Sequence, residues 1–440
     1  MNLATQIEHT LRTHRFPGLE EYLPEEFILP HYGGYSIANV PATVAALLGV
    51  ELPDGAPPLP THLWADPSGQ ASGRGMASGV RRVVLVLLDA VGYLHLQRYL
   101  TEEDSVFRHL AQAGRLVPLT SVFPSTTVAA LTTLRTGRTP LGHGFLGTKL
   151  LLSEQGLLAN MIKLAPAAHK RPEELLDWGW KPEEFVTVPS LAQQLAAAGV
   201  QSVAHTYLPH LAGGLSRIFL RGMTEVQGYA GFSDLWINLR RTLIQRQNEP
   251  LFVSAYWGST DTVAHLYGPE GEPFRAELRH LARALEEDFL APLPAAAREG
   301  TLLIIIADHG QTATPPERAV RLSDHPALQQ ALLLPPAGEP RAAYIYVRPG
   351  QADGLRAYVA EHLSGRFLLL EMERAVTAGL FGPEQPTPEL RARLGDFLLL
   401  ARNDSRLIVE KKKVPIHGHH GSLTPEEMLV PLLMVRLDGI

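Results

Sequence analysis

The sequence predicts an α/β fold in which a mostly parallel sheet carries helices on both faces and a small α+β cap is inserted late in the chain. Residues 85–88 and 301–307 are apolar without polar alternation, which is typical of parallel strands buried on both faces. Such runs alternate with stretches of helical length, the order that βαβ units require. Residues 320–415 depart from this order and mix shorter strands with helices.

Residues 1–80 are predicted to form an N-terminal helical extension and linker. Residues 40–50 combine Ala, Leu and Val with Pro41 near the start, a position where a helix tolerates proline. The aromatic loop at 31–35 is expected to pack against the main domain. Residues 51–79 are rich in Pro, Gly, Ser and Asp, a composition typical of an irregular linker.

The α/β catalytic core is predicted to comprise residues 81–319 and 416–440, with the α+β cap at 320–415 between them. The core strands are expected at 81–88, 115–120, 199–205, 251–257, 301–307 and 429–435. The core helices are expected at 105–113, 128–135, 190–198, 232–247 and 270–290. The cap is expected to hold a helix at 354–363 and strands at 341–347, 367–371, 397–401 and 407–410.

Composition excludes several classes of function. The 440 residues are 45% hydrophobic and 19% charged, with a net charge of −6, which leaves no electrostatic footprint for binding a nucleic acid polymer. No apolar run reaches the roughly 18 residues of a membrane span. The N-terminus lacks the basic start and apolar stretch of a secretory signal, so we expect a cytoplasmic protein. There is no cysteine, so a metal would be held by His, Asp, Glu or hydroxyl oxygen.

Candidate metal ligands recur where the expected strands end. Asp89 and the pair Asp308-His309 follow two apolar strands, Asp261 and His265 are spaced to share a helix face, and His417, His419 and His420 compete in the last loop. A lone Asp after a buried strand is usually a helix cap or a turn residue, and Asp308-His309-Gly310 alone could form a turn. Their joint recurrence at one sheet edge, where ligands bind, favours a metal site. Oxygen and imidazole ligands suit zinc, with manganese as second choice, and their number suits two ions that act on a phosphoryl group.

A nucleophile is expected in the hydroxyl-rich loop at 120–127, which leads into the helix at 128–135. Backbone N–H groups and the dipole at a helix N-terminus favour a phosphate oxyanion. A hydroxyl held there beside a metal ion has its pKa lowered and becomes a stronger nucleophile.

These motifs, in this order, resemble the alkaline phosphatase superfamily, and most closely its type I phosphodiesterase and nucleotide pyrophosphatase branch. The resemblance runs from about residue 81 to the C-terminus and rests on Leu88-Asp89-Ala90-Val91-Gly92, Phe123-Pro124-Ser125-Thr126-Thr127, Asp261 with His265, Asp308-His309-Gly310 and His420-Gly421. It implies an alkaline-phosphatase-like fold and two zinc ions. Asp261, His265 and His420 would bind one ion. The other would be bound by Asp89, Asp308, His309 and the nucleophile oxygen.

The resemblance also guides the choice of nucleophile. In the phosphodiesterase branch the nucleophilic threonine directly precedes Phe-Pro-Asn, but here Val122 precedes Phe123-Pro124. Eight residues usually separate the nucleophile from the Thr-Gly that ends the next helix, and this spacing selects Thr127. Thr126 and Ser125 remain alternatives. His420 is chosen as the final ligand because the residues from His420 to Glu427 are similar to the family's last ligand segment.

The sequence therefore predicts a metal-dependent phosphoric ester hydrolase, acting as a phosphodiesterase or nucleotide pyrophosphatase through a phosphothreonine intermediate. Its substrate is expected to be small and phosphorylated, such as a nucleotide, with no membrane partner and an unspecified oligomeric state. The expected substrate contacts are Tyr93, Thr126, Lys149, His205, Tyr207 and His419. Positive charge at Lys149 keeps a phosphomonoesterase or phosphomutase open as an alternative. A phosphonate hydrolase and a non-catalytic metal- or partner-binding protein also remain.

Overall fold

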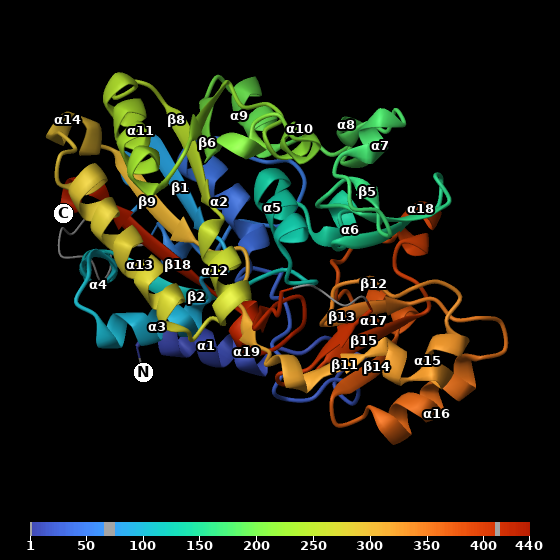
Figure 1. Ribbon diagram of the computed structural model, residues 1–440. Coiled ribbons are helices and arrows are strands. Elements are labelled where there is room, and N and C mark those ends of the chain that lie inside the picture. The colour runs from blue at the N-terminus through green and yellow to red at the C-terminus, as the bar shows by residue number, and fades with distance from the viewer. Residues whose placement is uncertain (1, 66–74, 410–413) are drawn as a thin grey trace.

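The computed structural model describes residues 2–65, 75–409 and 414–440, which form two seven-stranded sheets and two short two-stranded ones (Figure 1). The main sheet has the strand order β2-β18-β9-β1-β8-β6-β7. Its strands are β1 (Arg82–Leu88), β2 (Arg115–Thr120), β6 (Gln201–Tyr207), β7 (Glu225–Tyr229), β8 (Leu251–Trp257), β9 (Thr301–Ile306) and β18 (Leu429–Arg436).

The predicted mostly parallel sheet is confirmed. Strand β1 lies in the middle and pairs in parallel with β8 and β9, while β6 pairs in parallel with β8 and β7. Within this sheet β18 is the antiparallel strand, lying between β2 and β9. Leu88 lies opposite Trp257, and Leu87 lies opposite Ile306. These three strands therefore end at nearly the same level, and the residues that follow them meet at one edge.

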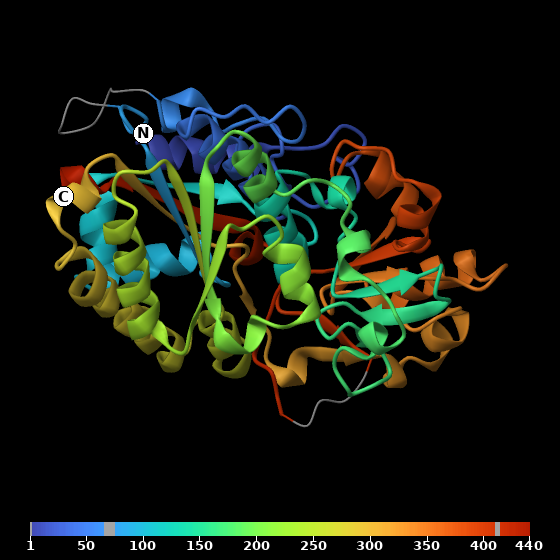
Figure 2. The same cartoon turned by 90° about the horizontal axis from the view of Figure 1, so that it is seen from above.

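Helices cover both faces of the main sheet (Figure 2). One face carries α3 (Tyr93–Glu102), α4 (Val106–Ala113), α11 (Phe232–Gln245) and α13 (Glu272–Ala284), which continues as a π-helical turn over Leu285–Leu290. The other face carries α2 (Val40–Leu47), α5 (Thr127–Thr136) and α9 (Leu191–Ala197), which contact one another. Because both faces are covered, every residue of β1 and β9 is buried, as their apolar sequences predict.

The second sheet is antiparallel throughout and has the order β14-β15-β13-β12-β3-β4-β5. Four of its strands come from the expected cap: β12 (Ala337–Gly338), β13 (Ala342–Ile345), β14 (Phe367–Glu371) and β15 (Phe397–Ala401). The other three precede it in the chain and extend the sheet: β3 (Lys149–Leu152), β4 (Leu157–Asn160) and β5 (Ala165–Pro166). They join at a pairing of Gly338 with Lys149. No strand was assigned at 149–166 from the sequence, and the structure shows that these strands are short and partly exposed.

Shorter elements complete the second sheet and its surroundings. The helices α15 (Pro326–Ala331) and α16 (Ala352–His362) pack against each other beside the sheet. The strand expected at 407–410 is β16 (Arg406–Ile408), paired with β11 (Ala319–Arg321), and residue 410 lies outside the described residues. The remaining short helices are α6 (Pro140–His143), α7 (Glu174–Asp177), α8 (Pro182–Phe185), α10 (Gly214–Phe219), α14 (Ala295–Arg298), α17 (Met372–Thr377), α18 (Pro388–Ala392) and α19 (Pro425–Met428).

The N-terminal segment is built into the core. Helix α1 (Leu3–Thr13) packs along β2. The Tyr32 hydroxyl accepts a hydrogen bond from the Phe123 N–H at 3.2 Å and donates one to the Leu380 carbonyl at 3.0 Å. The loop at 31–35 therefore packs against the main domain, as expected. Residues 66–74 of the expected linker lie outside the described residues. None of the described helices combines the length and apolar character that a membrane-spanning helix requires.

Candidate active site

Two clusters of metal-ligating side chains lie beyond the carboxyl ends of the central strands. Asp89 directly follows β1, and Asp308 and His309 follow β9 by one residue. Asp261 and His265 lie on α12 (Ser259–Tyr267), which begins two residues after β8. His420 follows β17 (Gly418–His419), a short strand that pairs with β10 (Thr312–Ala313). All six predicted protein ligands are thus brought to one edge of the sheet.

The first cluster, here called the buried cluster, consists of Asp89, Asp308 and His309. The His309 Nε2 atom lies 3.6 Å from Asp89 Oδ1 and 3.4 Å from Asp308 Oδ2. All three side chains are almost completely excluded from solvent. Asp89 Oδ1 and Asp308 Oδ2 are buried without a hydrogen-bond partner, a costly state for carboxylate oxygens. A divalent cation at this point would satisfy both of them.

The second cluster, here called the half-buried cluster, consists of Asp261, His265 and His420. Asp261 Oδ1 lies 3.4 Å from His265 Nε2 and 3.8 Å from His420 Nε2. The predicted spacing of Asp261 and His265 on one helix face brings their side chains together. Three ligands on a partly exposed site leave room for a substrate oxygen or water.

The two clusters are in direct contact through their histidines. The rings of His309 and His420 stack with centroids 3.8 Å apart and an interplanar angle of 16°. Each histidine also bonds to a backbone carbonyl through Nδ1: His265 to Gly418 at 2.6 Å, His309 to Gly310 at 3.0 Å and His420 to Ser125 at 2.9 Å. Donation from Nδ1 fixes the tautomer whose Nε2 lone pair is available to a metal ion. The donor set therefore fits two divalent cations.

Backbone and side-chain donors orient the carboxylates. The Tyr256 hydroxyl donates to Asp89 Oδ2, and the N–H groups of Ala90 and His309 donate to Asp308 Oδ1 at 3.1 and 3.0 Å. Gln311 donates from Nε2 to Asp261 Oδ1 at 2.5 Å. These bonds fix the direction in which each carboxylate presents its oxygens.

Burial and neighbouring charges of like sign shift the pKa values of two cluster residues. Desolvation raises the pKa of Asp89 well above its ordinary value, and the charges of Asp308 and Asp261 add to the rise. Desolvation lowers the pKa of His420 well below its ordinary value, and the neighbouring His309 and His265 lower it further. A bound cation favours the deprotonated form of both groups, so ion binding would reverse the shift at Asp89 and reinforce the one at His420.

Two glycines allow the loops of the buried cluster to meet. A Cβ atom on Gly310 would lie 2.0 Å from the Glu426 carbonyl oxygen and 2.9 Å from the Gly92 Cα. A Cβ atom on Gly92 would lie 3.0 Å from the Gly310 Cα. The backbones after Asp89 and after His309 therefore approach each other more closely than any larger residue permits.

The three candidate hydroxyls of the nucleophile loop, residues 120–127, have different hydrogen-bond partners. Thr127 Oγ1 lies 3.1 Å from His309 Nε2 in the buried cluster. Thr126 Oγ1 instead lies 3.4 Å from Thr148 Oγ1. Ser125 Oγ donates to the Ser422 carbonyl at 2.8 Å and accepts from the Gly421 N–H at 3.2 Å, so it fastens the loop that carries His420.

The predicted substrate contacts divide into two groups. Thr126 lies beside Thr127, and His419 lies beside the half-buried cluster, with its ring 5.7 Å from that of His265. Tyr207 is partly exposed at the end of β6, and its ring lies 5.9 Å from that of Tyr229, which stacks on Trp257.

Three other predicted contacts are not brought to the clusters by any bond in the described residues. Tyr93 is buried, and its hydroxyl accepts a hydrogen bond from Gln97. His205 is buried and faces α11, where its Nε2 lies 3.2 Å from Thr242 Oγ1. Lys149 pairs within the second sheet through its backbone, and its side chain forms no ion pair or hydrogen bond with the described residues.

Three residues near the clusters were not predicted from the sequence to belong to the site. Tyr256 and Gln311 orient ligands, and Glu339 hydrogen-bonds beside the nucleophile loop. The only sequence signal for the first two is their place close to a predicted ligand at a strand end. Glu339 had no such signal, because it comes from the second sheet and approaches the loop only in the folded chain.

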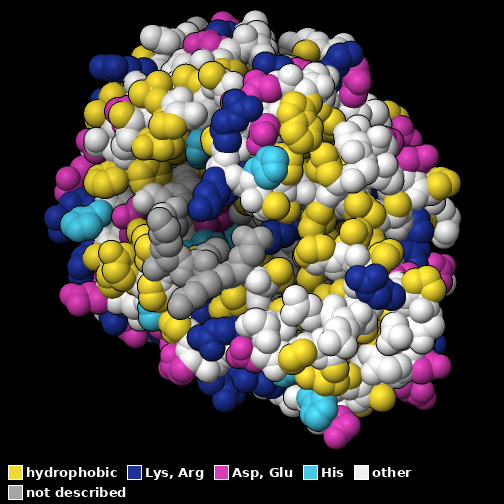
Figure 3. All heavy atoms as spheres, turned by 45° about the vertical axis from the view of Figure 1, so that its right-hand side comes forward, with side chains coloured by type: hydrophobic (Ala, Val, Ile, Leu, Met, Phe, Trp, Pro, Cys, Tyr) yellow, Lys and Arg dark blue, Asp and Glu magenta, His cyan; other side chains and the backbone are white. Residues whose placement is uncertain are grey.

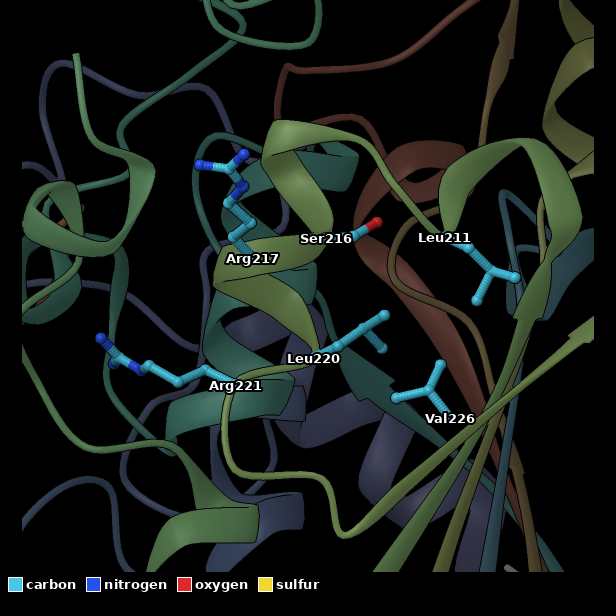
Figure 4. Close-up of a pocket in the computed structure, with 6 residues that line it drawn as sticks. All are labelled: Leu211, Ser216, Arg217, Leu220, Arg221 and Val226. Carbon is cyan, nitrogen blue, oxygen red and sulfur yellow. The ribbon is translucent and has the colours of Figure 1, made fainter. Parts of the chain in front are cut away.

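The surface is hollowed on the side where the core meets the second sheet, with acidic and histidine side chains at the floor of the hollow (Figure 3). A separate pocket of about 260 Å³ lies between α10 and β7 and is lined by Leu211, Ser216, Arg217, Leu220, Arg221 and Val226 (Figure 4). None of the cluster residues lines it. Arg221 donates to the backbone carbonyls of Val186 and Val188. This pocket is therefore distinct from the candidate active site.

The structure resembles several solved structures of low sequence identity. Murine ectonucleotide pyrophosphatase/phosphodiesterase 5, solved as an inactive variant in complex with AMP, is 18% identical with a TM-score of 0.58 over 80% of this chain and 87% of that chain. Phosphonoacetate hydrolase from Sinorhizobium meliloti, solved in complex with phosphonoformate, is 16% identical with a TM-score of 0.58 over 81% of this chain and 93% of that chain. These likenesses show the fold. No curated protein matches the chain.

The family model described as type I phosphodiesterase / nucleotide pyrophosphatase matches residues 83–423. This range includes the nucleophile loop and all six residues of the two clusters. The predicted resemblance is therefore confirmed, and the chain belongs to the type I phosphodiesterase / nucleotide pyrophosphatase family of the alkaline phosphatase superfamily.

Proposed function

We propose that this protein is a two-metal phosphodiesterase that hydrolyses small phosphoric diesters or pyrophosphates through a phosphothreonine at Thr127. The observation that carries the proposal is the position of the Thr127 hydroxyl. It lies 3.1 Å from His309 of the buried cluster, and His309 in turn stacks on His420 of the half-buried cluster. A nucleophile beside two adjacent cation sites is the arrangement that phosphoryl transfer requires.

The residues would hold the two ions as separate sets. Asp89, Asp308, His309 and the Thr127 oxygen would bind one ion, and Asp261, His265 and His420 would bind the other. Two bound divalent ions supply Lewis-acid stabilisation of the phosphoryl oxygens and lower the pKa of a coordinated hydroxyl. Zinc is our first choice, because the donor set is imidazole and carboxylate without sulfur, and manganese is our second.

The chain itself would position the reacting groups. Thr127 is the first residue of α5, and the preceding Thr126 makes no side-chain capping bond to the helix. The first N–H groups of α5 are therefore available to phosphoryl oxygens. Thr127 Oγ would form a bond to phosphorus as the bond to the leaving alcohol breaks. Water would then displace the threonine oxygen and release the phosphate monoester.

The leaving alcohol would occupy the carboxyl edge of the sheet beyond β6 and β8. Aromatic side chains form a row there, from Trp257 through Tyr229 to the partly exposed Tyr207. An aromatic wall suits a nucleoside or an aryl group. The AMP complex of the murine relative supports a nucleotide substrate, and His419 and Thr126 would complete the substrate contacts.

The proposal is tested with purified protein loaded with zinc or manganese. We expect hydrolysis of bis-p-nitrophenyl phosphate, loss of that activity after chelation and its recovery when the metal is returned. Thr127→Ala should abolish turnover while leaving the bound metal largely in place, whereas Thr126→Ala, which removes only a substrate contact, should lower turnover without abolishing it. A protein that binds no metal and shows no metal-restored activity, or a Thr127→Ala variant that stays active, would contradict the proposal.

A further inference from the structure

Glu339 is a buried carboxylate that the second sheet delivers to the nucleophile loop. It follows β12, and hydrogen bonds with Ala342 at 2.9 and 3.2 Å close the turn that leads into β13. The residue is only 6% exposed. The same turn presents Arg341 to the core, where it pairs with Glu427. The turn therefore places one positively charged side chain, Arg341, and one carboxylate, Glu339, between the second sheet and the core.

The carboxylate of Glu339 is held beside the nucleophile loop through Thr148. Its Oε1 atom accepts from the Thr148 N–H at 2.6 Å, and the Thr148 hydroxyl lies 3.4 Å from that of Thr126. Thr126 directly precedes the proposed nucleophile Thr127. On its other side Glu339 packs against Gly421, where an added Cβ would lie 2.7 Å from the Glu339 Cβ. Glu339 thus lies between the nucleophile loop and the segment that carries His420.

The negative charge of Glu339 has no ion-pair partner in the part of the chain that the structure describes. Glu427, which also lies between the second sheet and the core, does have an ion-pair partner, because Arg341 binds its carboxylate at 2.7 and 2.9 Å. Desolvation raises the pKa of Glu339, and this rise is opposed by the hydrogen bonds from Thr148 and Thr126 and by the charge of His309.

We propose that Glu339 is a specificity-determining residue that disfavours dianionic phosphate monoesters relative to monoanionic diesters. This inference rests on the proposed function, because it assumes that the phosphoryl group binds beside Thr127. A monoester carries a second negative charge above its second pKa of about 6, whereas a diester cannot. An unpaired carboxylate next to the phosphoryl site repels that extra charge in a buried environment where screening is weak.

A purely structural role for Glu339 makes a different prediction. If the residue only fastened the second sheet to the nucleophile loop, its neutralisation would lower the kcat/KM for both substrate classes by similar factors. An electrostatic role changes the ratio between them. The informative quantity is therefore the kcat/KM for p-nitrophenyl phosphate divided by that for bis-p-nitrophenyl phosphate, measured at pH 8 on the metal-loaded protein.

The test compares Glu339→Gln, Glu339→Asp and Glu384→Gln with the unmodified protein. Glu384 is the matched control, because its carboxylate likewise accepts a hydrogen bond from a threonine, here from the Thr139 hydroxyl, but forms no hydrogen bond with Thr148 or the nucleophile loop in the described residues. We expect the monoester-to-diester ratio to rise about tenfold in Glu339→Gln, on the scale of removing one nearby charge. The ratio should stay near the unmodified value in Glu339→Asp and Glu384→Gln.

An unchanged ratio in folded Glu339→Gln, or an equal rise in Glu339→Asp, would overturn the inference. If Glu339→Gln does not fold, the pH dependence of the unmodified protein decides: the monoester-to-diester ratio should fall as the monoester gains its second negative charge above a pKa of about 6, and a ratio that does not fall would overturn the inference. Failure of the proposed function is distinguishable, because the protein would then hydrolyse neither substrate or would remain active without Thr127.

Discussion

Each histidine and aspartate of the two clusters forms a hydrogen bond with a neighbouring protein group. Three histidines bond to backbone carbonyls through Nδ1. Asp89 and Asp308 each use one oxygen for a protein donor and leave the other unpartnered. The sequence was sufficient to predict which residues form the two clusters, because carboxylates and histidines after apolar strands are visible in it. It did not predict these supports, because backbone carbonyls carry no sequence signal.

The role of Tyr256 in orienting Asp89 can be tested by substitution. Its hydroxyl donates to Asp89 Oδ2, so Tyr256→Phe should loosen the orientation of Asp89 without creating a large cavity. Loss of such a support typically weakens metal affinity by about 10–100-fold. Titration calorimetry of the metal-free protein with zinc measures the change. Tyr346→Phe is the control, because it removes a hydroxyl bonded to the Ala392 carbonyl in the second sheet. Equal zinc affinity in the unmodified protein and Tyr256→Phe would disprove this role.

At the scale of elements, the core was predictable because its strands are distinctive. Strands β1, β8 and β9 are continuous apolar runs, and the structure places each within a residue of its predicted bounds. Helix α3 was missed because polar residues break up its pattern. The antiparallel direction of β18 was not predictable, since direction depends on which neighbours the strand joins. Strands β3, β4 and β5 were missed because their stability comes from pairing in the second sheet rather than from local sequence.

The ion pair of Arg341 and Glu427 fastens the second sheet to the loop that carries His420. Both side chains are 0% exposed, and Glu427 also accepts from the Ser422 N–H at 3.0 Å and the Thr424 hydroxyl at 2.6 Å. Glu427→Ala leaves the Arg341 charge buried and unpaired. It should therefore lower the free energy of unfolding by about 3–5 kcal/mol.

Urea denaturation measures this loss of stability. The matched control is Glu270→Ala, which removes the exposed partner of Arg98 at 2.9 Å. Exposed ion pairs contribute at most about 1 kcal/mol, so the control should change little. If both variants lost the same small amount of stability, the buried pair would not be a major link between the second sheet and the loop that carries His420.

At the scale of the whole molecule, the candidate site depends on parts of the chain that are far apart in sequence. The N-terminal segment contacts the nucleophile loop through Tyr32. In the second sheet, Glu339 accepts a hydrogen bond from Thr148, whose hydroxyl lies beside that of Thr126. The sequence predicted that the loop at 31–35 would pack on the core. It could not show that Tyr32 joins the nucleophile loop to residue 380, because such a contact exists only after both segments have folded.

Tyr32→Phe tests this long-range support. The substitution leaves the Phe123 N–H and the Leu380 carbonyl without their buried partner, which should cost about 1–3 kcal/mol of stability. Thermal or urea unfolding gives the magnitude. Tyr22→Phe is a suitable comparison, because Tyr22 is 43% exposed and should tolerate the change. A Tyr32→Phe variant as stable as the unmodified protein would show that the hydroxyl is not a structural bridge.

The central claim is that Thr127 is the nucleophile of a two-metal phosphoryl-transfer site. The most direct measurement is to quench the metal-loaded protein with acid during turnover of bis-p-nitrophenyl phosphate and to map the covalent adduct by mass spectrometry. We predict that the peptide spanning the nucleophile loop gains the phosphoryl-containing fragment of the substrate, attached to Thr127. An adduct on Thr126 or Ser125 would contradict this account.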